Sequence, residues 1–208
     1  SNRGFNFRCT VYYIMNYKVL SRKYRPQTFS EIIGQSHVVD TLINSISTNR
    51  LAHGYLFSGL RGVGKTTTAR VLSKTLNCLN LIDSYPCGKC QNCIEITESR
   101  SLDVIELDGA SNRGIDEIRE IKETVKYPPI SSTYKIFIID EVHMLTKEAF
   151  NALLKTLEEP PENVIFILAT TDSYKIPDTI LSRTLRFDFK KITNKQLSQH
   201  LVNILNKE

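Results

Sequence analysis

The sequence predicts an α/β protein with a central parallel sheet that helices cover on both faces. Short, continuous apolar runs alternate along the chain with longer segments in which apolar residues recur at helical spacing. Continuous apolar strands, rather than strands that alternate between apolar and polar residues, are typical of sheets buried on both sides. With 208 residues, 41% of them hydrophobic, the chain can bury the core of one full domain. No apolar run approaches the ~20 residues that a membrane span requires, so we expect no membrane association.

Apolar runs of this kind occur at five places. The expected strands are YLFSG (55–59), LDVIEL (102–107), KIFIID (135–140), NVIFILATT (163–171) and LRFDF (185–189). The second, third and fourth are expected to be buried, and the third has the composition of a central parallel strand that ends in an acidic residue.

Segments with helical spacing lie between these strands. The expected helices occupy 36–46, 66–77, the later part of 109–125, 148–159, 176–184 and 194–205. Ser36 is a plausible N-cap for the first of them. Pro160 and Pro161 would stop the helix at 148–159, because proline cannot continue an α-helix.

The charge of the chain is distributed unevenly. The formal net charge is +5, yet residues 1–30 carry six basic groups and no acidic one. The remainder is close to neutral, so bulk charge does not argue for nucleic-acid binding. The basic segment is either an arm that faces DNA or phosphate groups, or a solvated terminus.

A glycine-rich motif follows the first expected strand. The sequence GLRGVGKT (59–66) fits G-x-x-x-x-G-K-[ST] and leads into the helix at 66–77, as a phosphate-binding loop requires. Lys65 would reach the β- and γ-phosphates and the Thr66 hydroxyl would bind Mg²⁺. The nucleotide-binding residues expected here are Gly59, Leu60, Arg61, Gly62, Val63, Gly64, Lys65, Thr66 and Thr67.

An acidic pair ends the strand at 135–140. We expect this strand to neighbour the one that precedes the phosphate loop. Asp140 would then hold Mg²⁺ through water, and Glu141 would polarise an attacking water. An isolated Asp-Glu pair is often a simple strand-end turn, but beside a phosphate loop it predicts an ATPase that uses ATP and Mg²⁺.

Four of the five cysteines have metal-ligand spacing. The pattern is Cys78-x8-Cys87-x2-Cys90-x2-Cys93, and a Cys-Gly-x-Cys turn can present two sulfurs to one ion. Four thiolates without an open position predict a structural Zn²⁺ site. No secretory signal is visible, so the expected compartment is the cytoplasm, where disulfides are disfavoured.

Two other classes of protein remain as alternatives. DEVH (140–143) matches the D-E-x-H box of helicases, and ATT (169–171) is similar to their third motif. Such helicases place the nucleotide between two lobes, whereas 208 residues hold one. The other alternative is a DNA-binding module that zinc stabilises and whose ATP site is inactive. His143 alone is more typical of a packing or hydrogen-bonding residue at a strand end.

Several motifs together resemble the clamp-loader AAA+ ATPases. They are LSRKYRPQTFSEIIGQ (20–35), GLRGVGKTTTAR (59–70), DEVHML (140–145), KTLEEPP (155–161), ILATTD (167–172) and LSRT (181–184). The resemblance runs from about Lys18 to the end of the chain. It is greatest for the gamma/tau branch of the bacterial DNA polymerase III clamp loaders, whose zinc module this chain matches cysteine for cysteine.

The resemblance implies roles for further residues. Thr170 or Thr171 corresponds to the sensor 1 position beside the γ-phosphate. Arg183 corresponds to the arginine finger that completes the ATP site of a neighbouring subunit in trans. Thr184 departs from the pattern, because the gamma/tau branch usually has Cys there. Three residues are implied to lie near the adenine and the ribose, namely Tyr24, Arg25 and Pro26.

The resemblance also implies an architecture and a set of partners. Residues 1–14 precede a natural-looking start at Met15 and are expected to be a non-native extension. Residues 15–192 would form the AAA+ domain, with the zinc module at 78–93, and 193–208 the first helix of a helical lid. The implied partners are other clamp-loader subunits in a ring, the sliding clamp, primer–template DNA and, through regions absent here, the replicative polymerase. The polymerase active site is not in this chain.

Overall fold

The strands of the computed structural model, which describes residues 19–208, form one sheet in the order β2-β3-β4-β1-β5. Their bounds are Gly54–Ser58 (β1), Val104–Asp108 (β2), Lys135–Asp140 (β3), Val164–Thr170 (β4) and Leu185–Asp188 (β5). Every neighbouring pair is parallel, so the carboxyl ends of all these strands lie at one edge. The expected extension at 1–14 and the start at Met15 lie outside the described residues.

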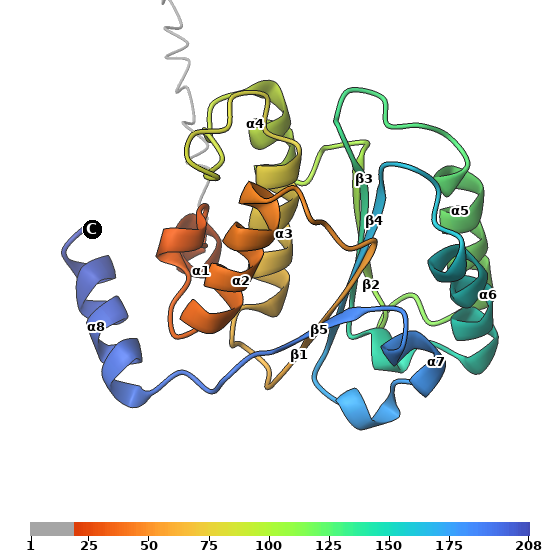
Figure 1. The fold of residues 1–208 in the computed structure, drawn as a ribbon. Coiled ribbons are helices and arrows are strands. Elements are labelled where there is room, and N and C mark those ends of the chain that lie inside the picture. The colour runs from red at the N-terminus through yellow and green to blue at the C-terminus, as the bar shows by residue number, and fades with distance from the viewer. Residues whose placement is uncertain (1–18) are drawn as a thin grey trace, which may run out of the picture.

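Helices cover both faces of the sheet (Figure 1). The α-helices are Leu20–Lys23 (α1), Ser36–Ser47 (α2), Lys65–Leu76 (α3), Gln91–Thr97 (α4), Ile115–Val125 (α5), Lys147–Glu158 (α6), Asp178–Leu181 (α7) and Asn194–Leu205 (α8). Short 3₁₀ helices are Phe29–Glu31 (η1), Val142–Met144 (η2) and Ser173–Lys175 (η3). In Figure 1, α1 to α4 lie on one side of the sheet, α5 to α7 lie on the other, and an extended segment leads to α8. Among the described residues, no helix has the length and apolarity to span a bilayer.

The core consists of two apolar clusters, one on each face of the sheet. Tyr55 and Phe57 of β1 pack with α2 and α3, whereas Leu56 between them packs with α5 and α6 on the other face. Each large apolar side chain that is fully buried contributes ~1.5–3 kcal/mol relative to an exposed one. Burial on both faces explains why the central strands lack apolar–polar alternation.

The α/β fold with a parallel sheet is confirmed, and so are the expected strands and helices within a few residues at their ends. Three local expectations are wrong. LDVIEL (102–107) is only partly buried, because β2 is an edge strand. Ser36 is the first helical residue of α2, and no side chain caps this helix. The strand that ends at Asp140 does not neighbour β1, since β4 lies between them.

Asp103, immediately before β2, fixes the loop that follows α5. The residue is 0% exposed. Its carboxylate accepts backbone N–H bonds from Ile130 at 2.7 Å, Ser131 at 2.8 Å and Ser132 at 2.9 Å. Burial works against the charge, but these hydrogen bonds outweigh burial and lower the pKa of Asp103. The loop therefore depends on an ionised carboxylate.

Asp103→Ala is expected to lower the free energy of unfolding by about 2–4 kcal/mol, because three backbone donors lose their acceptor. The folded pKa lies below the unfolded value of about 3.9, so the stabilisation is present above about pH 4 and is lost as the pH falls through the folded pKa. Urea denaturation of wild type and variant should give a difference that is large at pH 7 and shrinks on acidification. Asp116→Ala is the matched control, because Asp116 is exposed; a comparable loss there would contradict the assignment.

Candidate functional site

The phosphate loop connects the end of β1 to the start of α3. Gly64 stands at the N-cap of α3 with φ +101°, a left-handed conformation that side chains disfavour. Gly59, at the start of the loop, lies against the residue that follows β5, and an added Cβ would come within 2.7 Å of the Phe189 carbonyl oxygen. Both positions therefore require glycine, and the backbone N–H groups at the start of α3 are free to face an anion.

Lys65 lies inside this loop. The residue is 5% exposed, and its Nζ donates to the carbonyl oxygens of Gly59 at 2.8 Å and Leu60 at 2.9 Å. Burial lowers the pKa of Lys65, while the negative charges of Glu141 and Asp140 oppose that shift. The ammonium group is thus held within the loop by carbonyl groups that an anionic phosphate would outcompete.

Thr66 and Asp140 meet at the same edge of the sheet. The Thr66 hydroxyl donates to Oδ2 of Asp140 at 2.5 Å, although β4 separates the strands that lead to them. A hydroxyl and a carboxylate in contact are the oxygen ligands that Mg²⁺ prefers in proteins. The donor set therefore fits the expected magnesium ion.

Glu141 belongs to a hydrogen-bond network with the residues at the end of β4. Its Oε2 accepts from the Thr171 hydroxyl at 2.8 Å and lies 3.3 Å from Nδ1 of His143. Nδ1 of His143 also lies 3.0 Å from the hydroxyl of Thr170, which is fully buried. Thr171 thus contacts Glu141 directly, whereas Thr170 contacts His143, whose Nδ1 also lies beside the Glu141 carboxylate. His143 is a hydrogen-bonding residue, as expected from its position.

A cavity of about 540 Å³ brings most of these residues together. Its lining comprises Arg25, Arg61, Gly62, Gly64, Lys65, Thr66, Thr67, Asp108, Ala110, Asp140 and Glu141. The sequence analysis did not identify Asp108 as a site residue. Asp108 is the last residue of β2 and lies in register with Asp140, the last residue of β3. Hydrogen bonds from the Ser111 hydroxyl and the Ala110 N–H lower the pKa of Asp108. Its place at the end of an expected strand was the signal that could have revealed it.

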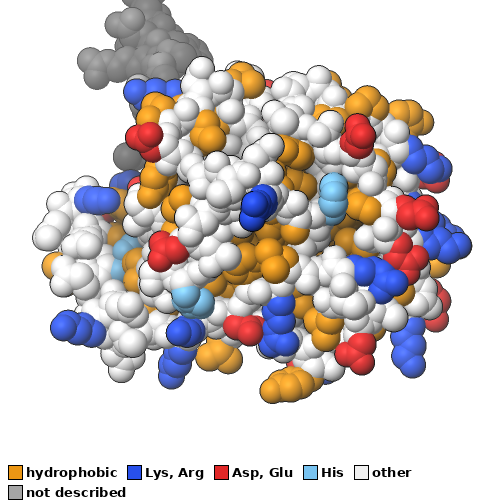
Figure 2. All heavy atoms as spheres, viewed as in Figure 1, with side chains coloured by type: hydrophobic (Ala, Val, Ile, Leu, Met, Phe, Trp, Pro, Cys, Tyr) orange, Lys and Arg blue, Asp and Glu red, His pale blue; other side chains and the backbone are white. Residues whose placement is uncertain are grey.

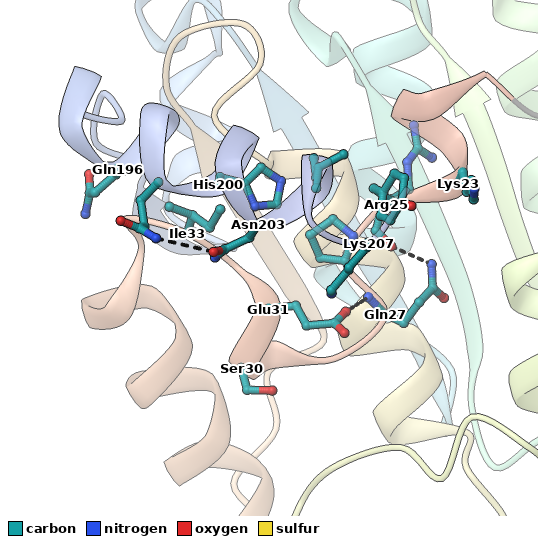
Figure 3. Close-up of a pocket in the computed structure, with 14 residues that line it drawn as sticks. Lys23, Arg25, Gln27, Ser30, Glu31, Ile33, Gln196, His200, Asn203 and Lys207 are labelled. Carbon is teal, nitrogen blue, oxygen red and sulfur yellow. Dashed lines mark hydrogen bonds between the residues drawn. The ribbon is translucent and has the colours of Figure 1, made fainter.

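A second cavity of about 530 Å³ lies between residues 23–33 and α8 (Figure 3). Tyr24, Arg25 and Pro26 line it, together with side chains of α8 such as His200 and Asn203. Among the residues that the structure describes, Arg25 alone lines both cavities. Burial lowers the pKa of Arg25, and the nearby Arg70 guanidinium lowers it further. Because the positive charge of Arg25 is disfavoured here, an anion beside it would be stabilised.

Arg183 lies at the other end of the sheet. Its backbone carbonyl approaches Gly54, the first residue of β1. The phosphate loop follows Ser58, the last residue of β1. At about 3.3 Å per residue, β1 separates the two by roughly 15 Å. The side chain donates to the Thr179 carbonyl at 2.7 Å and pairs with Glu158 at 2.7 Å. The structure therefore does not bring Arg183 to the phosphate cavity of its own chain.

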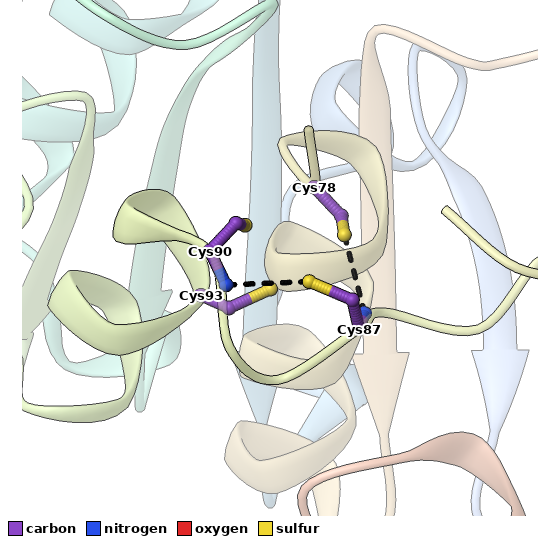
Figure 4. A group of neighbouring side chains, drawn as sticks. All are labelled: Cys78, Cys87, Cys90 and Cys93. Atoms are coloured by element: carbon purple, nitrogen blue, oxygen red, sulfur yellow. Dashed lines mark hydrogen bonds between the residues drawn. The ribbon is translucent and has the colours of Figure 1, made fainter. Parts of the chain in front are cut away.

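The four-cysteine cluster is assembled by α3, a tight turn and α4 (Figure 4). The sulfur atoms of Cys78, Cys87, Cys90 and Cys93 all lie within 4.8 Å of one another. A tetrahedral ion with bonds of about 2.3 Å needs sulfur–sulfur separations of about 3.8 Å, so the cluster fits Zn²⁺. Backbone N–H groups of Lys89 and Cys90 lower the pKa of Cys87 to about 6, while burial raises the pKa of Cys93.

Purification without chelators is expected to give one zinc per chain, and Cys93→Ser is expected to reduce this below about half an equivalent and to lower the melting temperature. The reason is that Cys93 is fully buried and joins α4 to the cluster. Elemental analysis and thermal denaturation would measure both effects, with Cys9→Ser as the control outside the four-cysteine pattern. Full zinc content in Cys93→Ser would contradict the four-thiolate site.

The parallel sheet with its phosphate loop and the acidic pair at the end of β3 define a P-loop ATPase fold of the AAA+ class. The family model described as DNA polymerase III, delta subunit, matches residues 34–193, and the chain belongs to that family. The resemblance to the tau/gamma subunits is confirmed by sequence. The chain is 52% identical over 194 residues to DNA polymerase III subunit tau/gamma of Haemophilus influenzae, covering 93% of this chain and 28% of that protein.

A further relative and two solved structures are also similar to this chain. DNA polymerase III subunit tau of Escherichia coli is 53% identical over 93% of this chain and 30% of its own length. The chain thus spans about a third of such relatives. Among solved structures, a DNA polymerase III gamma subunit-related protein of Thermotoga maritima has a TM-score of 0.51 at 26% identity, covering 81% of this chain and 54% of that chain. The RuvB Holliday junction branch migration motor of the same organism, with a TM-score of 0.57 at 22% identity over 85% of this chain and 52% of that chain, shares the fold.

Proposed function

We propose that this chain is the ATP-binding and ATP-hydrolysing core of a clamp-loader subunit that acts in DNA replication. One observation supports this most strongly. Lys65 in the phosphate loop and the Thr66–Asp140 contact face one cavity at the carboxyl edge of the sheet, with Glu141 beside them. These side chains are the set that phosphoryl transfer to water requires.

In this proposal each residue has one task. The loop N–H groups and Lys65 bind the polyphosphate, and Thr66 and Asp140 hold its metal ion. Bound Mg²⁺ would neutralise charge on the β- and γ-phosphates. Glu141 polarises the attacking water, and its carboxylate is oriented by the Thr171 hydroxyl. The position of Thr170 and Thr171 at the end of β4 suits a sensor of the γ-phosphate.

The adenosine part of ATP would occupy the second cavity, where Tyr24, Arg25 and Pro26 face α8. Arg25 lines both cavities, so it stands where a nucleoside would join its phosphates. A nucleotide in this place would hold α8, the first helix of the proposed lid (193–208), against the body of the domain. That arrangement would link nucleotide binding to the position of the lid.

The partners follow from the relatives and from Arg183. The tau and gamma relatives are named as subunits of DNA polymerase III. We therefore propose a ring with other clamp-loader subunits, in which Arg183 reaches a neighbour's ATP, and whose ATP-bound form opens the sliding clamp on primer–template DNA. Contact with the replicative polymerase would involve regions outside this chain.

Lys65→Ala is expected to weaken ATP binding by at least about tenfold, because the phosphates lose a charge-assisted contact. Titration with a fluorescent ATP analogue would measure the affinity, and circular dichroism would verify the fold. Lys126→Ala is the matched control, since Lys126 is exposed and pairs only with Glu123 among the described residues. An unchanged affinity for ATP in Lys65→Ala would contradict the proposed ATPase and favour the DNA-binding module that zinc stabilises.

A further inference from the structure

Lys74 is a buried charged residue that the proposed mechanism does not use. It lies in α3 and is 3% exposed. Its Nζ donates to Oε1 of Gln27 at 2.6 Å and to Oγ1 of Thr97 at 3.1 Å. A buried ammonium group is costly unless it is paired, so these two partners are strongly constrained in position.

The contact with Lys74 fixes the orientation of the Gln27 amide. A lysine ammonium can only donate, so the oxygen of the amide must face Lys74 and its NH₂ group must face away. That NH₂ group donates to the Arg25 carbonyl at 2.8 Å, and the Gln27 N–H donates to Glu31 at 2.6 Å (Figure 3). Gln27 thereby holds the backbone of Arg25, the residue that lines both cavities.

On its other side, Lys74 contacts the helix that begins within the four-cysteine module. Thr97 is the last residue of α4, the helix that carries Cys93. The Thr97 hydroxyl lies 2.7 Å from the Cys93 carbonyl, to which it can donate, leaving an oxygen lone pair for Lys74. Burial lowers the pKa of Lys74, and negative charge on Cys93 and Glu31 opposes that shift. Four thiolates around one Zn²⁺ would carry a net negative charge that favours the ammonium group at this place.

We propose that Lys74 is a positioning residue that joins the zinc module to the nucleoside part of the nucleotide site, through Gln27 and the backbone of Arg25. The inference rests on the proposed function. If Lys74 has this role, recognition of the nucleoside depends on it and recognition of the phosphates does not. The phosphate loop stands at the opposite end of α3 and has no part in this link, whereas the Tyr24–Pro26 segment depends on it.

The test compares two ligands of the same protein. In Lys74→Met the ammonium group is lost while the side chain keeps a similar length. Isothermal titration calorimetry should give an affinity for ATP that is about tenfold weaker and an affinity for inorganic tripolyphosphate that changes by less than about twofold. Lys74→Arg, which keeps donors at this position, should recover most of the ATP affinity. Lys126→Met, at the exposed residue that follows α5, should change neither affinity.

Variants of Gln27 test whether Lys74 acts through this residue. Gln27→Leu should reproduce the split between ATP and tripolyphosphate, and the double variant with Lys74→Met should be no weaker than either single one. Zinc content should stay near one per chain in Lys74→Met, which would show that the module is intact. A proportional fall in both affinities, or an unchanged ATP affinity, would overturn the inference. A wild-type protein that binds neither ligand would instead overturn the proposed function.

Discussion

Glu141→Gln is expected to leave ATP binding nearly unchanged and to lower hydrolysis in the proposed ring by about 10²–10⁴-fold. An amide of the same shape can still accept the Thr171 hydroxyl bond, but it cannot polarise water as a carboxylate does. Lys65 and Thr66, which would bind the phosphates and the metal ion, remain in place. Phosphate release at saturating ATP and titration with a fluorescent ATP analogue would measure the two effects separately.

The matched control for this prediction is Glu120→Gln, which removes a carboxylate from the exposed side of α5. Hydrolysis by this variant should equal that of the wild type. If Glu141→Gln rings hydrolyse ATP within about twofold of the wild-type rate, Glu141 is not the residue that activates water. A loss of affinity as large as the loss of rate would place Glu141 in binding instead.

Arg183→Ala is expected to preserve ATP affinity but to lower hydrolysis by about 10³-fold in a ring made only of the variant. Arg183 stands at the amino end of β1, whereas the phosphate loop follows the carboxyl end. Its loss therefore cannot disturb the phosphate cavity of the same chain directly. Arg119→Ala, which removes an exposed guanidinium from α5, is the control.

Mixed rings give a sharper version of this test. An Arg183→Ala subunit keeps Glu141, and a Glu141→Gln subunit keeps Arg183, so one of the interfaces between them has both groups. Mixing the two inactive variants should therefore restore part of the hydrolysis. Mixed rings that stay inactive, or normal hydrolysis by the ring of Arg183→Ala alone, would contradict action in trans.

Much of the fold could be predicted because the central strands are buried on both faces. KIFIID and NVIFILATT have the continuous apolar composition that is typical of interior strands, and they form β3 and β4. The edge position of β2 could not be predicted, since LDVIEL has a similar composition and strand order depends on contacts between distant segments. Helix α4 was missed because its seven residues lie among the cysteines, whose spacing indicated a metal site rather than a helix.

The candidate site was predictable to the extent that local motifs carry it. The phosphate loop and the acidic pair are contiguous in sequence, and the structure places Thr66 beside Asp140. Asp108 and the Lys74–Gln27 contact were not visible, because they depend on which segments fold next to one another. The proximity of His143 to both Thr170 and Glu141 likewise could not be predicted, because it depends on how β3 and β4 lie side by side.

The edge position of β2 has a consequence for the behaviour of the protein in solution. Within residues 19–208, β2 has a partner strand on one side alone. An unpaired side offers backbone donors and acceptors to any other extended chain, which invites aggregation. Glu106 and Asp108 place exposed carboxylates along this strand, and Arg70 pairs with the first of them. The Asp108 charge and the Arg70–Glu106 ion pair both oppose pairing with a second copy of the same strand. The lowered pKa of Asp108 keeps part of that protection in mildly acidic solution.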